Sequence, residues 1–313
     1  MATGAVRQCD VAVVGAGVSG LAAAAQCAER GASVVCIEEA GMSGGLIANI
    51  GKLDGFPAPG PLSGAALIDS MLQMCKASGV TLLNAKVSGL AAVGNHSTLT
   101  TDQGTVVAKR VVVASGARLR LLGVPGETEL AGRGVSQCNW CDGGFFRNES
   151  VVVVGGGDAA FQAALHLADF CASVTIVMRS SAVRARRSYV LAAADNPRIA
   201  FHWDMVVERI IGVERVEGVL LNNLAEGGKE EHPAAGVFVF IGTEPNSGFL
   251  PPQVARDACG RVTTNADYQS SLAGVYAIGG VRSDYRGQVM SACGEGAAAA
   301  AAVIEDLKRH ELL

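Results

Sequence analysis

Two glycine-rich loops, each set between an apolar stretch and an alanine-containing stretch, constrain the fold of this chain more than any other feature. The first loop, Gly15-Ala16-Gly17-Val18-Ser19-Gly20, follows a predicted strand at residues 10–15 and opens a predicted helix over roughly residues 19–30. A second predicted strand, residues 33–38, ends in Glu38-Glu39. Strand, G-x-G-x-x-G loop, helix, strand and terminal acid in this order are typical of a dinucleotide-binding βαβ unit.

The first loop predicts how such a nucleotide would bind. Its glycines let the backbone approach a pyrophosphate, which rests on the amino-terminal end of the helix. Glu38 lies 18 residues after Gly20 and is placed to accept a hydrogen bond from an adenosine ribose hydroxyl. The predicted contacts are Gly15, Gly17, Val18, Ser19, Gly20, Glu38 and Glu39.

The same pattern repeats in the middle of the chain. Residues 151–154 are four valines, the G-x-G-x-x-A loop at residues 155–160 opens a predicted helix to about residue 170, and residues 173–178 form the next strand. Arg179 replaces the terminal acid, and Arg184, Arg186 and Arg187 follow. Arginine suits the 2′-phosphate of NADPH, although these residues could also form only a solvated basic loop. The predicted contacts are Gly155, Gly157, Asp158, Ala159, Ala160, Arg179 and Arg184.

The order of the segments predicts that the middle unit is inserted into the first. Two strand-to-Gly/Pro stretches, residues 111–126 and 237–252, frame it, and residues 274–280 and 288–310 then read as a strand and an alanine-rich helix of the first unit. An acidic nucleotide unit at the N-terminus favours FAD. We therefore predict an α/β protein with two Rossmann-like domains, the NADPH domain inserted into the FAD domain. The expected ranges are 1–119 with 248–313 for FAD, and 120–247 for NAD(P)H.

The segment Cys138-Asn139-Trp140-Cys141, followed by Asp142, lies shortly before the second glycine loop. Two cysteines at this spacing can close a disulfide ring or bind metal. A zinc site would need two more ligands at short spacing, but there is no second C-x-x-C and the five histidines are isolated, so redox chemistry is favoured and no metal is expected. Asp142 would then supply and accept protons. The remaining cysteines are expected to be buried inert thiols: Cys9, Cys27, Cys36, Cys75, Cys171, Cys259 and Cys293.

Composition argues against several classes of function. The net charge of -4, without a local Lys/Arg cluster, supplies no basic face for nucleic acid. No apolar run reaches membrane-spanning length. The N-terminus, MATGAVRQCD, leads into a strand without a basic-then-apolar leader, and a cytoplasmic location is expected.

Together these motifs resemble the low-molecular-weight thioredoxin reductases, a branch of the FAD-dependent pyridine nucleotide–disulfide oxidoreductases. The resemblance implies FAD and NADPH as cofactors, with electrons passing from NADPH to FAD, to a Cys138–Cys141 disulfide and on to a thioredoxin-like protein. It also implies that Cys141 faces the flavin, Cys138 exchanges with the substrate, Asp142 is the acid/base partner, the middle domain rotates on its linkers, and the enzyme is a homodimer. The motifs span nearly the whole chain: GAGVSG, GVPGE (123–127), GRGVSQCNWCDG (132–143), GGGDAA, IGTEPN (241–246), GVYAIGG and GEGAAAA (294–300).

The resemblance adds flavin contacts and also reveals departures. It places Gly45 and Leu46, Gln288 and Val289, and the strand end Gly279-Gly280 at the flavin. The departures are Gly280 where the family has an Asp, Met178 and Ser180 where it has other residues of a His-Arg-Arg motif, Gly144 in place of an aromatic residue, and a bulky Trp140 inside the redox ring. Arg133, which matches a thioredoxin contact, is retained.

These departures leave two alternatives open. Relatives of the gliotoxin, holomycin and depsipeptide type use the same scaffold as dithiol oxidases, which close a disulfide in a small molecule and pass electrons to oxygen or NADP⁺. A non-catalytic nucleotide-binding module is the other alternative. The intact Cys-x-x-Cys-Asp argues against it, because a binding module has no need of a dithiol with a proton partner.

Overall fold

The computed structural model describes residues 6–39, 41 and 43–313, and by its internal contacts the chain divides into two compact units. Unit 1 comprises Met1–Arg118 and Glu244–Leu313, and unit 2 comprises Leu119–Thr243. The sequence-based boundaries lay after residues 119 and 247. Residues 1–5, on which the expectation about a leader partly rests, lie outside the described residues.

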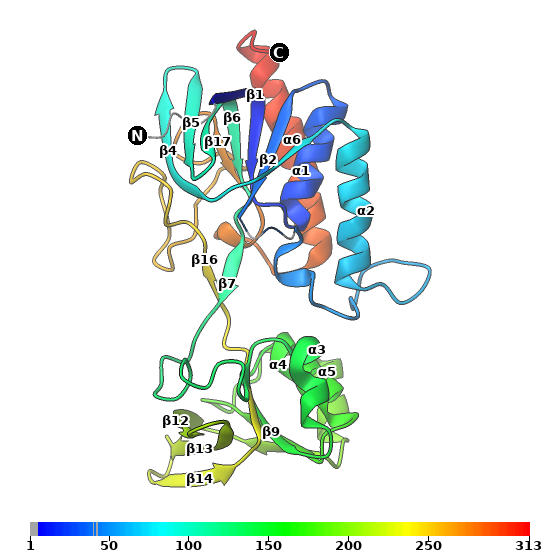
Figure 1. Ribbon diagram of the computed structural model, residues 1–313, viewed down its shortest axis with the longest axis vertical. Coiled ribbons are helices and arrows are strands. Elements are labelled where there is room, and N and C mark those ends of the chain that lie inside the picture. The colour runs from blue at the N-terminus through cyan, green and yellow to red at the C-terminus, as the bar shows by residue number, and fades with distance from the viewer. Residues whose placement is uncertain (1–5, 40, 42) are drawn as a thin grey trace. The chain divides into compact units, whose positions relative to one another are not determined.

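Unit 1 is built on a seven-stranded sheet with the order β3-β2-β1-β6-β5-β4, in which β17 also pairs with β6 (Figure 1). Strands β3, β2, β1, β6 and β17 are parallel, whereas β4 and β5 add an antiparallel edge. The strands are β1 (Val6–Val14), β2 (Val34–Glu38), β3 (Thr81–Asn84), β4 (Val87–Val93), β5 (His96–Thr101), β6 (Gly104–Val113) and β17 (Val275–Ala277). The helices are α1 (Val18–Glu29), α2 (Gly64–Ala77) and α6 (Val289–Arg309), with short 3₁₀ turns η1 (Gly45–Ile47) and η3 (Gly279–Val281).

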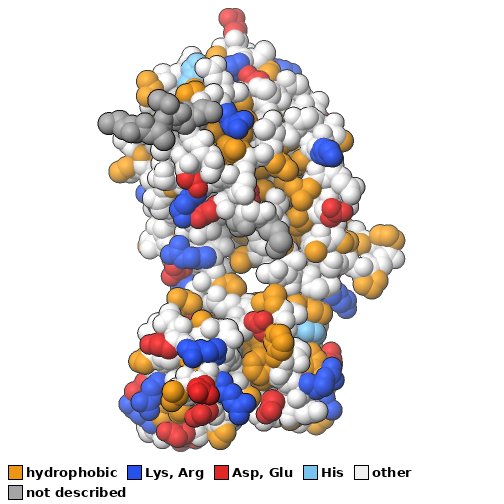
Figure 2. All heavy atoms as spheres, in the orientation of Figure 1, with side chains coloured by type: hydrophobic (Ala, Val, Ile, Leu, Met, Phe, Trp, Pro, Cys, Tyr) orange, Lys and Arg blue, Asp and Glu red, His pale blue; other side chains and the backbone are white. Residues whose placement is uncertain are grey.

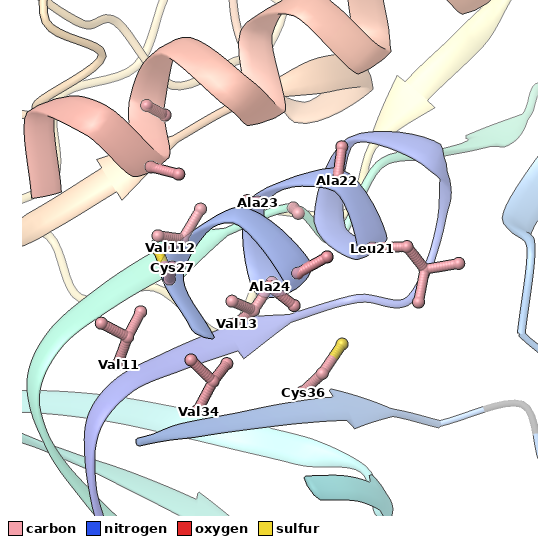
Figure 3. Packing of buried hydrophobic residues seen from close by; sticks show 14 of the residues in the cluster. Val11, Val13, Leu21, Ala22, Ala23, Ala24, Cys27, Val34, Cys36 and Val112 are labelled. Atoms are coloured by element: carbon pink, nitrogen blue, oxygen red, sulfur yellow. The ribbon is translucent and has the colours of Figure 1, made fainter. Parts of the chain in front are cut away.

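Small side chains let α1 pack closely on both of its neighbours. Figure 3 shows Ala23, Ala24 and Cys27 of α1 over Val11 and Val13 of β1. On the α6 side, a Cβ added at Gly296 would lie 2.5 Å from the Ser19 carbonyl oxygen. The alanine and glycine content therefore has a structural reason, because it brings the first glycine loop and the start of α1 between the sheet and α6.

Unit 2 has a five-stranded parallel sheet, in the order β11-β10-β9-β15-β8, and a separate three-stranded antiparallel sheet, in the order β12-β13-β14. The parallel strands are β8 (Val135–Ser136), β9 (Ser150–Val154), β10 (Ser173–Val177), β11 (Ile199–His202) and β15 (Gly236–Val239). The antiparallel strands are β12 (Met205–Gly212), β13 (Val216–Asn223) and β14 (Lys229–Pro233). The helices are α3 (Asn139–Asp142), α4 (Asp158–Ala168) and α5 (Arg187–Ala194), with the 3₁₀ turn η2 (Gly143–Phe146).

The chain passes between the units twice, within the two Gly/Pro stretches that the sequence singled out. The crossing segments β7 (Ala117–Leu119) and β16 (Thr243–Pro245) pair with each other as a two-stranded ribbon. Close to the crossing, the Asn246 amide nitrogen donates to the Ser115 carbonyl at 2.9 Å, and the Ser115 hydroxyl donates to the Asn246 carbonyl at 2.8 Å. These reciprocal bonds tie the two crossing strands together on the unit 1 side.

Two surface properties bear on function. Among the residues that the structure describes, no helix is both long and apolar enough to cross a membrane. On the face shown in Figure 2, Lys and Arg side chains are interspersed with Asp and Glu side chains.

The expectation of seven buried thiols is wrong for two of them. Cys259 is exposed because it lies in a tight turn, where its N–H donates to Asp257 Oδ1 at 2.8 Å, and Cys293 on α6 is only half-buried. The other five are buried, and burial raises the pKa of the Cys9, Cys75 and Cys171 thiols to about 11. At neutral pH those three stay protonated.

Candidate active site

The glycines of the first loop are of two kinds: Gly15 and Gly20 have no room for a side chain, whereas Gly17 has. Gly15 has φ +106°, and a Cβ there would lie 2.3 Å from the Ala114 carbonyl oxygen. A Cβ at Gly20 would lie 1.9 Å from the Gly15 carbonyl oxygen. These two positions therefore exclude any other residue, because the strand, loop and helix come together there.

Gly17 is different, because its backbone would accept a side chain without strain. Its φ of -77° and ψ of -178° suit any residue, and the nearest atom to an added Cβ is the Gly44 carbonyl oxygen at 4.0 Å. The missing side chain leaves backbone accessible at the amino-terminal end of α1, where Val18 and Ser19 are buried in the first turn. A diphosphate group fits this bare backbone, as the dinucleotide-binding pattern requires.

The predicted ribose acid and the loop near residue 45 lie against the same glycine loop. Glu38, at the end of β2, accepts a hydrogen bond from the Ala16 N–H at 2.7 Å. The Gly44 N–H donates to the Ala16 carbonyl at 2.8 Å, and this bond brings the neighbouring Gly45 and Leu46 to the loop. Glu39, in contrast, points into solvent and pairs with Lys86 at 2.5 Å.

The C-terminal part of unit 1 reaches the loop through Gly279. This glycine has φ +67°, and a Cβ there would lie 2.5 Å from Ser19 Oγ. At Gly280 an added Cβ would have the Ala117 nitrogen as its nearest atom, at 3.4 Å. Gln288 is the N-terminal cap of α6 and Val289 is its first residue, and Val289 packs against the core cluster that contains Val18 of the loop.

Glu295 is a buried acid that sequence reasoning missed. It accepts a hydrogen bond from the Gly279 N–H at 2.7 Å and pairs with Arg282 Nη2 at 2.7 Å. Its only sequence signal was its place in the GEGAAAA motif, where it reads as an exposed helix residue. It anchors the Gly279-Gly280 turn to α6, next to the first loop.

The second glycine loop likewise has one glycine without room for a side chain, Gly155, and one with room for it, Gly157. Gly155 has φ +143°, and a Cβ there would lie 2.2 Å from the Phe240 carbonyl oxygen. No atom lies within 4 Å of a Cβ added at Gly157, whose φ is -107°. Asp158 and Ala159 open α4, and Ala160 is fully buried. This backbone also fits a diphosphate group.

The arginine segment after β10 lies against this second loop through the backbone of Arg184 and through Arg186. The Arg184 N–H donates to the Gly156 carbonyl at 3.0 Å, while the side chains of Arg179 and Arg184 are exposed. Arg186, which was not among the predicted contacts, donates its N–H to Asp158 Oδ1 at 2.8 Å and pairs through Nε with Asp158 Oδ2 at 2.9 Å. The exposed arginines are free to meet an anionic group, whereas Arg186 is engaged by the loop's own acid.

Cys138 and Cys141 form a disulfide around the short helical turn α3. Cys138 is the N-terminal cap of the turn and is half-buried, whereas Cys141 is exposed. The Cys141 N–H donates to Cys138 Sγ at 3.1 Å. This bond favours negative charge on Cys138 once the disulfide opens.

A buried serine links the disulfide to Asp142. The Ser136 hydroxyl donates to Asp142 Oδ2 at 2.6 Å, and the Cys138 N–H donates to Ser136 Oγ at 2.9 Å. Sequence reasoning missed Ser136, although a serine two residues before the first cysteine is a recognisable turn former. It holds the Asp142 carboxylate beside the redox turn.

The two residues inside the redox ring contact α4. Trp140 stacks on His166, with ring centroids 3.7 Å apart, and Asn139 Nδ2 lies 3.0 Å from His166 Nδ1. His166 was treated as an isolated histidine, and no local motif links it to the cysteines. Among the described residues, no cluster of three or more His, Cys, Asp or Glu is arranged to hold a metal ion.

Comparison with known proteins identifies the group to which this arrangement belongs. A family described as pyridine nucleotide-disulphide oxidoreductase matches residues 9–296. The chain belongs to this family. It is similar to thioredoxin reductases of Treponema pallidum (strain Nichols), with 37% identity over 93% of this chain and 94% of that protein, and of Peptoclostridium acidaminophilum, with 35% identity over 93% and 94%.

Solved structures place the chain more closely within the family. The Lactococcus lactis thioredoxin reductase in its FR conformation matches with a TM-score of 0.93 and 31% identity, over 96% of this chain and 99% of that one. The T. acidophilum thioredoxin reductase matches with a TM-score of 0.90 and 29% identity over the same shares. The predicted fold class and the resemblance to low-molecular-weight thioredoxin reductases are confirmed.

The family assignment settles the class of chemistry. The chain is a flavin-dependent thiol–disulfide oxidoreductase of the thioredoxin reductase type, whose cofactors are FAD and NADPH. The bare backbone at Gly17 and Gly157 fits two nucleotide diphosphates. Nothing in these relatives favours the dithiol-oxidase alternative.

Proposed function

We propose that this oxidoreductase reduces a thioredoxin-like protein with electrons from NADPH, and that it works as a cytoplasmic homodimer. One observation carries the proposal: a disulfide closes the short turn α3, and Ser136 holds the Asp142 carboxylate beside it. The names of the relatives support the substrate, since both curated relatives and both solved structures named above are thioredoxin reductases.

In this proposal each unit holds one cofactor. Unit 1, predicted as residues 1–119 with 248–313, binds FAD, and unit 2, predicted as residues 120–247, binds NADPH. The bare backbone at Gly17 and Gly157 would hold their diphosphates. FAD is held by Gly15, Gly17, Val18, Ser19, Gly20, Glu38, Glu39, Gly45, Leu46, Gly279, Gly280, Gln288 and Val289. NADPH is held by Gly155, Gly157, Asp158, Ala159, Ala160, Arg179 and Arg184.

When bound, FAD and NADPH supply two-electron redox chemistry. With two protons, two electrons open the Cys138–Cys141 bond to a pair of thiols. The Cys138 thiolate, favoured by the Cys141 N–H, attacks the substrate disulfide, forms a mixed disulfide and expels one substrate thiolate. Cys141 then attacks Cys138, the ring disulfide closes again, and the second substrate thiolate leaves. Asp142 takes protons from the attacking thiols and returns them to the leaving thiolates.

A pocket beside the redox turn supports a protein substrate. Arg133, Ser136, Asp142, Phe145 and Phe146 are among the residues that line it. Phe145 is 83% exposed, so its ring is available for an apolar contact with a substrate protein at this pocket. The retained Arg133 adds a cation at the rim.

Turnover with defined substrates tests the proposal. FAD-loaded protein is mixed with NADPH and an oxidised thioredoxin, and in parallel with a small dithiol plus oxygen or NADP⁺. Rapid NADPH consumption with thioredoxin alone is expected. Fast oxidation of the small dithiol without any turnover of thioredoxin would refute the proposed direction and substrate.

A further inference from the structure

The redox ring of unit 2 rests on one face of helix α4. A Cβ at Gly143, directly after Asp142, would lie 2.9 Å from Leu167 Cδ2 and 3.1 Å from Phe170 Cζ, so the turn packs closely on this helix. His166 stands in the same place, between the ring and Phe170, with an edge-to-face contact of 5.3 Å to Phe170. The contact with Phe170 restrains the His166 imidazole on the side away from the redox ring.

His166 contacts both of the residues that separate the two cysteines. Its ring stacks on Trp140 at a centroid distance of 3.7 Å and an interplanar angle of 28°. Its Nδ1 lies 3.0 Å from Nδ2 of Asn139, whose side chain is buried with 8% of the residue exposed. A buried amide that loses its hydrogen-bond partner destabilises the fold, so this contact is a strong restraint on the turn.

The hydrogen bond defines the form of the imidazole. An amide nitrogen donates, so Nδ1 accepts and the proton of a neutral ring sits on Nε2. Burial lowers the pKa of His166, against the opposing effect of Asp169 at the end of α4. Both observations describe a neutral side chain that acts through shape and hydrogen bonding.

We propose that His166 is a positioning residue for the redox disulfide, holding the Cys138–Cys141 turn in shape when the sulfur–sulfur bond is open. While the disulfide is closed, the covalent ring already restrains the turn. Once it opens, α3 has only four residues and cannot persist alone, so the contacts of Asn139 and Trp140 with His166 take over. The two sulfurs then stay close, and the dithiol closes again more readily.

The proposal predicts a direction for the redox equilibrium, and it rests on the proposed redox role of Cys138 and Cys141. Freeing the turn adds conformational freedom to the dithiol but little to the closed ring. The relevant equilibrium is the reduction of the protein disulfide by two glutathione molecules, which yields the protein dithiol and glutathione disulfide. This equilibrium therefore shifts towards the protein dithiol. His166→Ala is expected to raise this equilibrium constant about tenfold, which corresponds to a potential about 30 mV less negative.

The experiment equilibrates FAD-loaded protein with glutathione buffers, traps thiols by alkylation and reads the Cys138–Cys141 peptide by mass spectrometry. His166→Phe, which keeps a flat ring but no acceptor, should shift the constant less, by about threefold. His232→Ala is the matched control, because His232 is another half-buried histidine of unit 2, bonded to Thr175 at 3.1 Å and without a contact to the ring among those described. An unchanged constant in His166→Ala, or an equal shift in His232→Ala, would overturn the proposal.

A second measurement keeps His166 unchanged and follows the accessibility of Trp140 instead. Trp203→Phe leaves Trp140 as the one tryptophan of the two in the chain. If His166 holds the opened turn, acrylamide quenches Trp140 equally before and after reduction. A large increase in quenching on reduction would contradict the proposal. A wild-type Cys138–Cys141 disulfide that neither glutathione nor NADPH through FAD reduces would instead refute the proposed redox function itself.

Discussion

Replacing Gly17 by alanine should separate cofactor binding from folding. The backbone at Gly17 already has angles that alanine adopts, and the closest atom to the new methyl group would be 4.0 Å away. The FAD-free protein should therefore be as stable as the wild type, or more stable by about 0.4–1 kcal/mol, because alanine restricts the unfolded chain.

FAD affinity should fall sharply in the same variant. The methyl group would stand where the diphosphate approaches the backbone, and would displace at least one hydrogen bond to a charged oxygen. Such a bond contributes about 1.5–3 kcal/mol, which corresponds to a roughly 10- to 100-fold weaker Kd. Gly157→Ala in the second loop, with no atom within 4 Å of the new Cβ, should weaken NADPH in the same way.

Gly20→Ala is the matched control with the opposite outcome. Its methyl group would lie 1.9 Å from the Gly15 carbonyl oxygen, so the loop must shift and FAD-free protein should lose about 1–3 kcal/mol of stability. Urea denaturation of flavin-free protein and titration with FAD, followed by flavin fluorescence, give both quantities. The reasoning is refuted if Gly17→Ala binds FAD as tightly as the wild type, or is destabilised as much as Gly20→Ala.

Three further predictions follow from contacts outside the redox ring. Gly280→Asp should tighten FAD binding, because the substitution restores the acid of the family and the new Cβ fits at 3.4 Å from its nearest atom. Unchanged or weaker binding in a flavin titration would count against the placement of Gly280 at the flavin. Asp306→Ala should lower the free energy of unfolding by about 3–5 kcal/mol in urea, since it removes the carboxylate that pairs with the buried Arg110. Lys86→Ala, in an exposed pair, should leave the free energy of unfolding unchanged. Burial lowers the pKa of His166 and His232 below the ordinary 6.5, so as the pH falls the unfolded chain takes up protons before the folded one does. The free energy of unfolding should therefore decrease as the pH drops below about 6.5. Replacing both histidines by Phe should make this decrease smaller, as measured by urea denaturation at several pH values.

The two nucleotide-binding units could be predicted because their signals are local. Valine-rich strands, glycine loops and alanine-rich helices follow one another within about thirty residues, and each element's residues carry their own propensity. Boundaries were less accurate. Strand β1 begins at Val6 rather than near residue 10, because it pairs with Thr105 and its neighbours on β6, a partner far along the chain.

The details of the site depended on contacts that no local pattern reveals. Ser136 lay two residues from Cys138 and could have been found as a turn former. His166 could not, since it is 25 residues beyond Cys141 and meets the ring only because α4 packs beneath it. Arg186 likewise reads as one basic residue among several, and only the folded loop shows that it pairs with Asp158.

The central claim is that the Cys138–Cys141 disulfide accepts electrons from NADPH through FAD. Anaerobic titration of FAD-loaded protein with NADPH, followed by flavin absorbance, tests it directly. The wild type should take up two two-electron equivalents per FAD, one for the flavin and one for the disulfide, while Cys138→Ser should take up one. Equal uptake by the two proteins would contradict the claim.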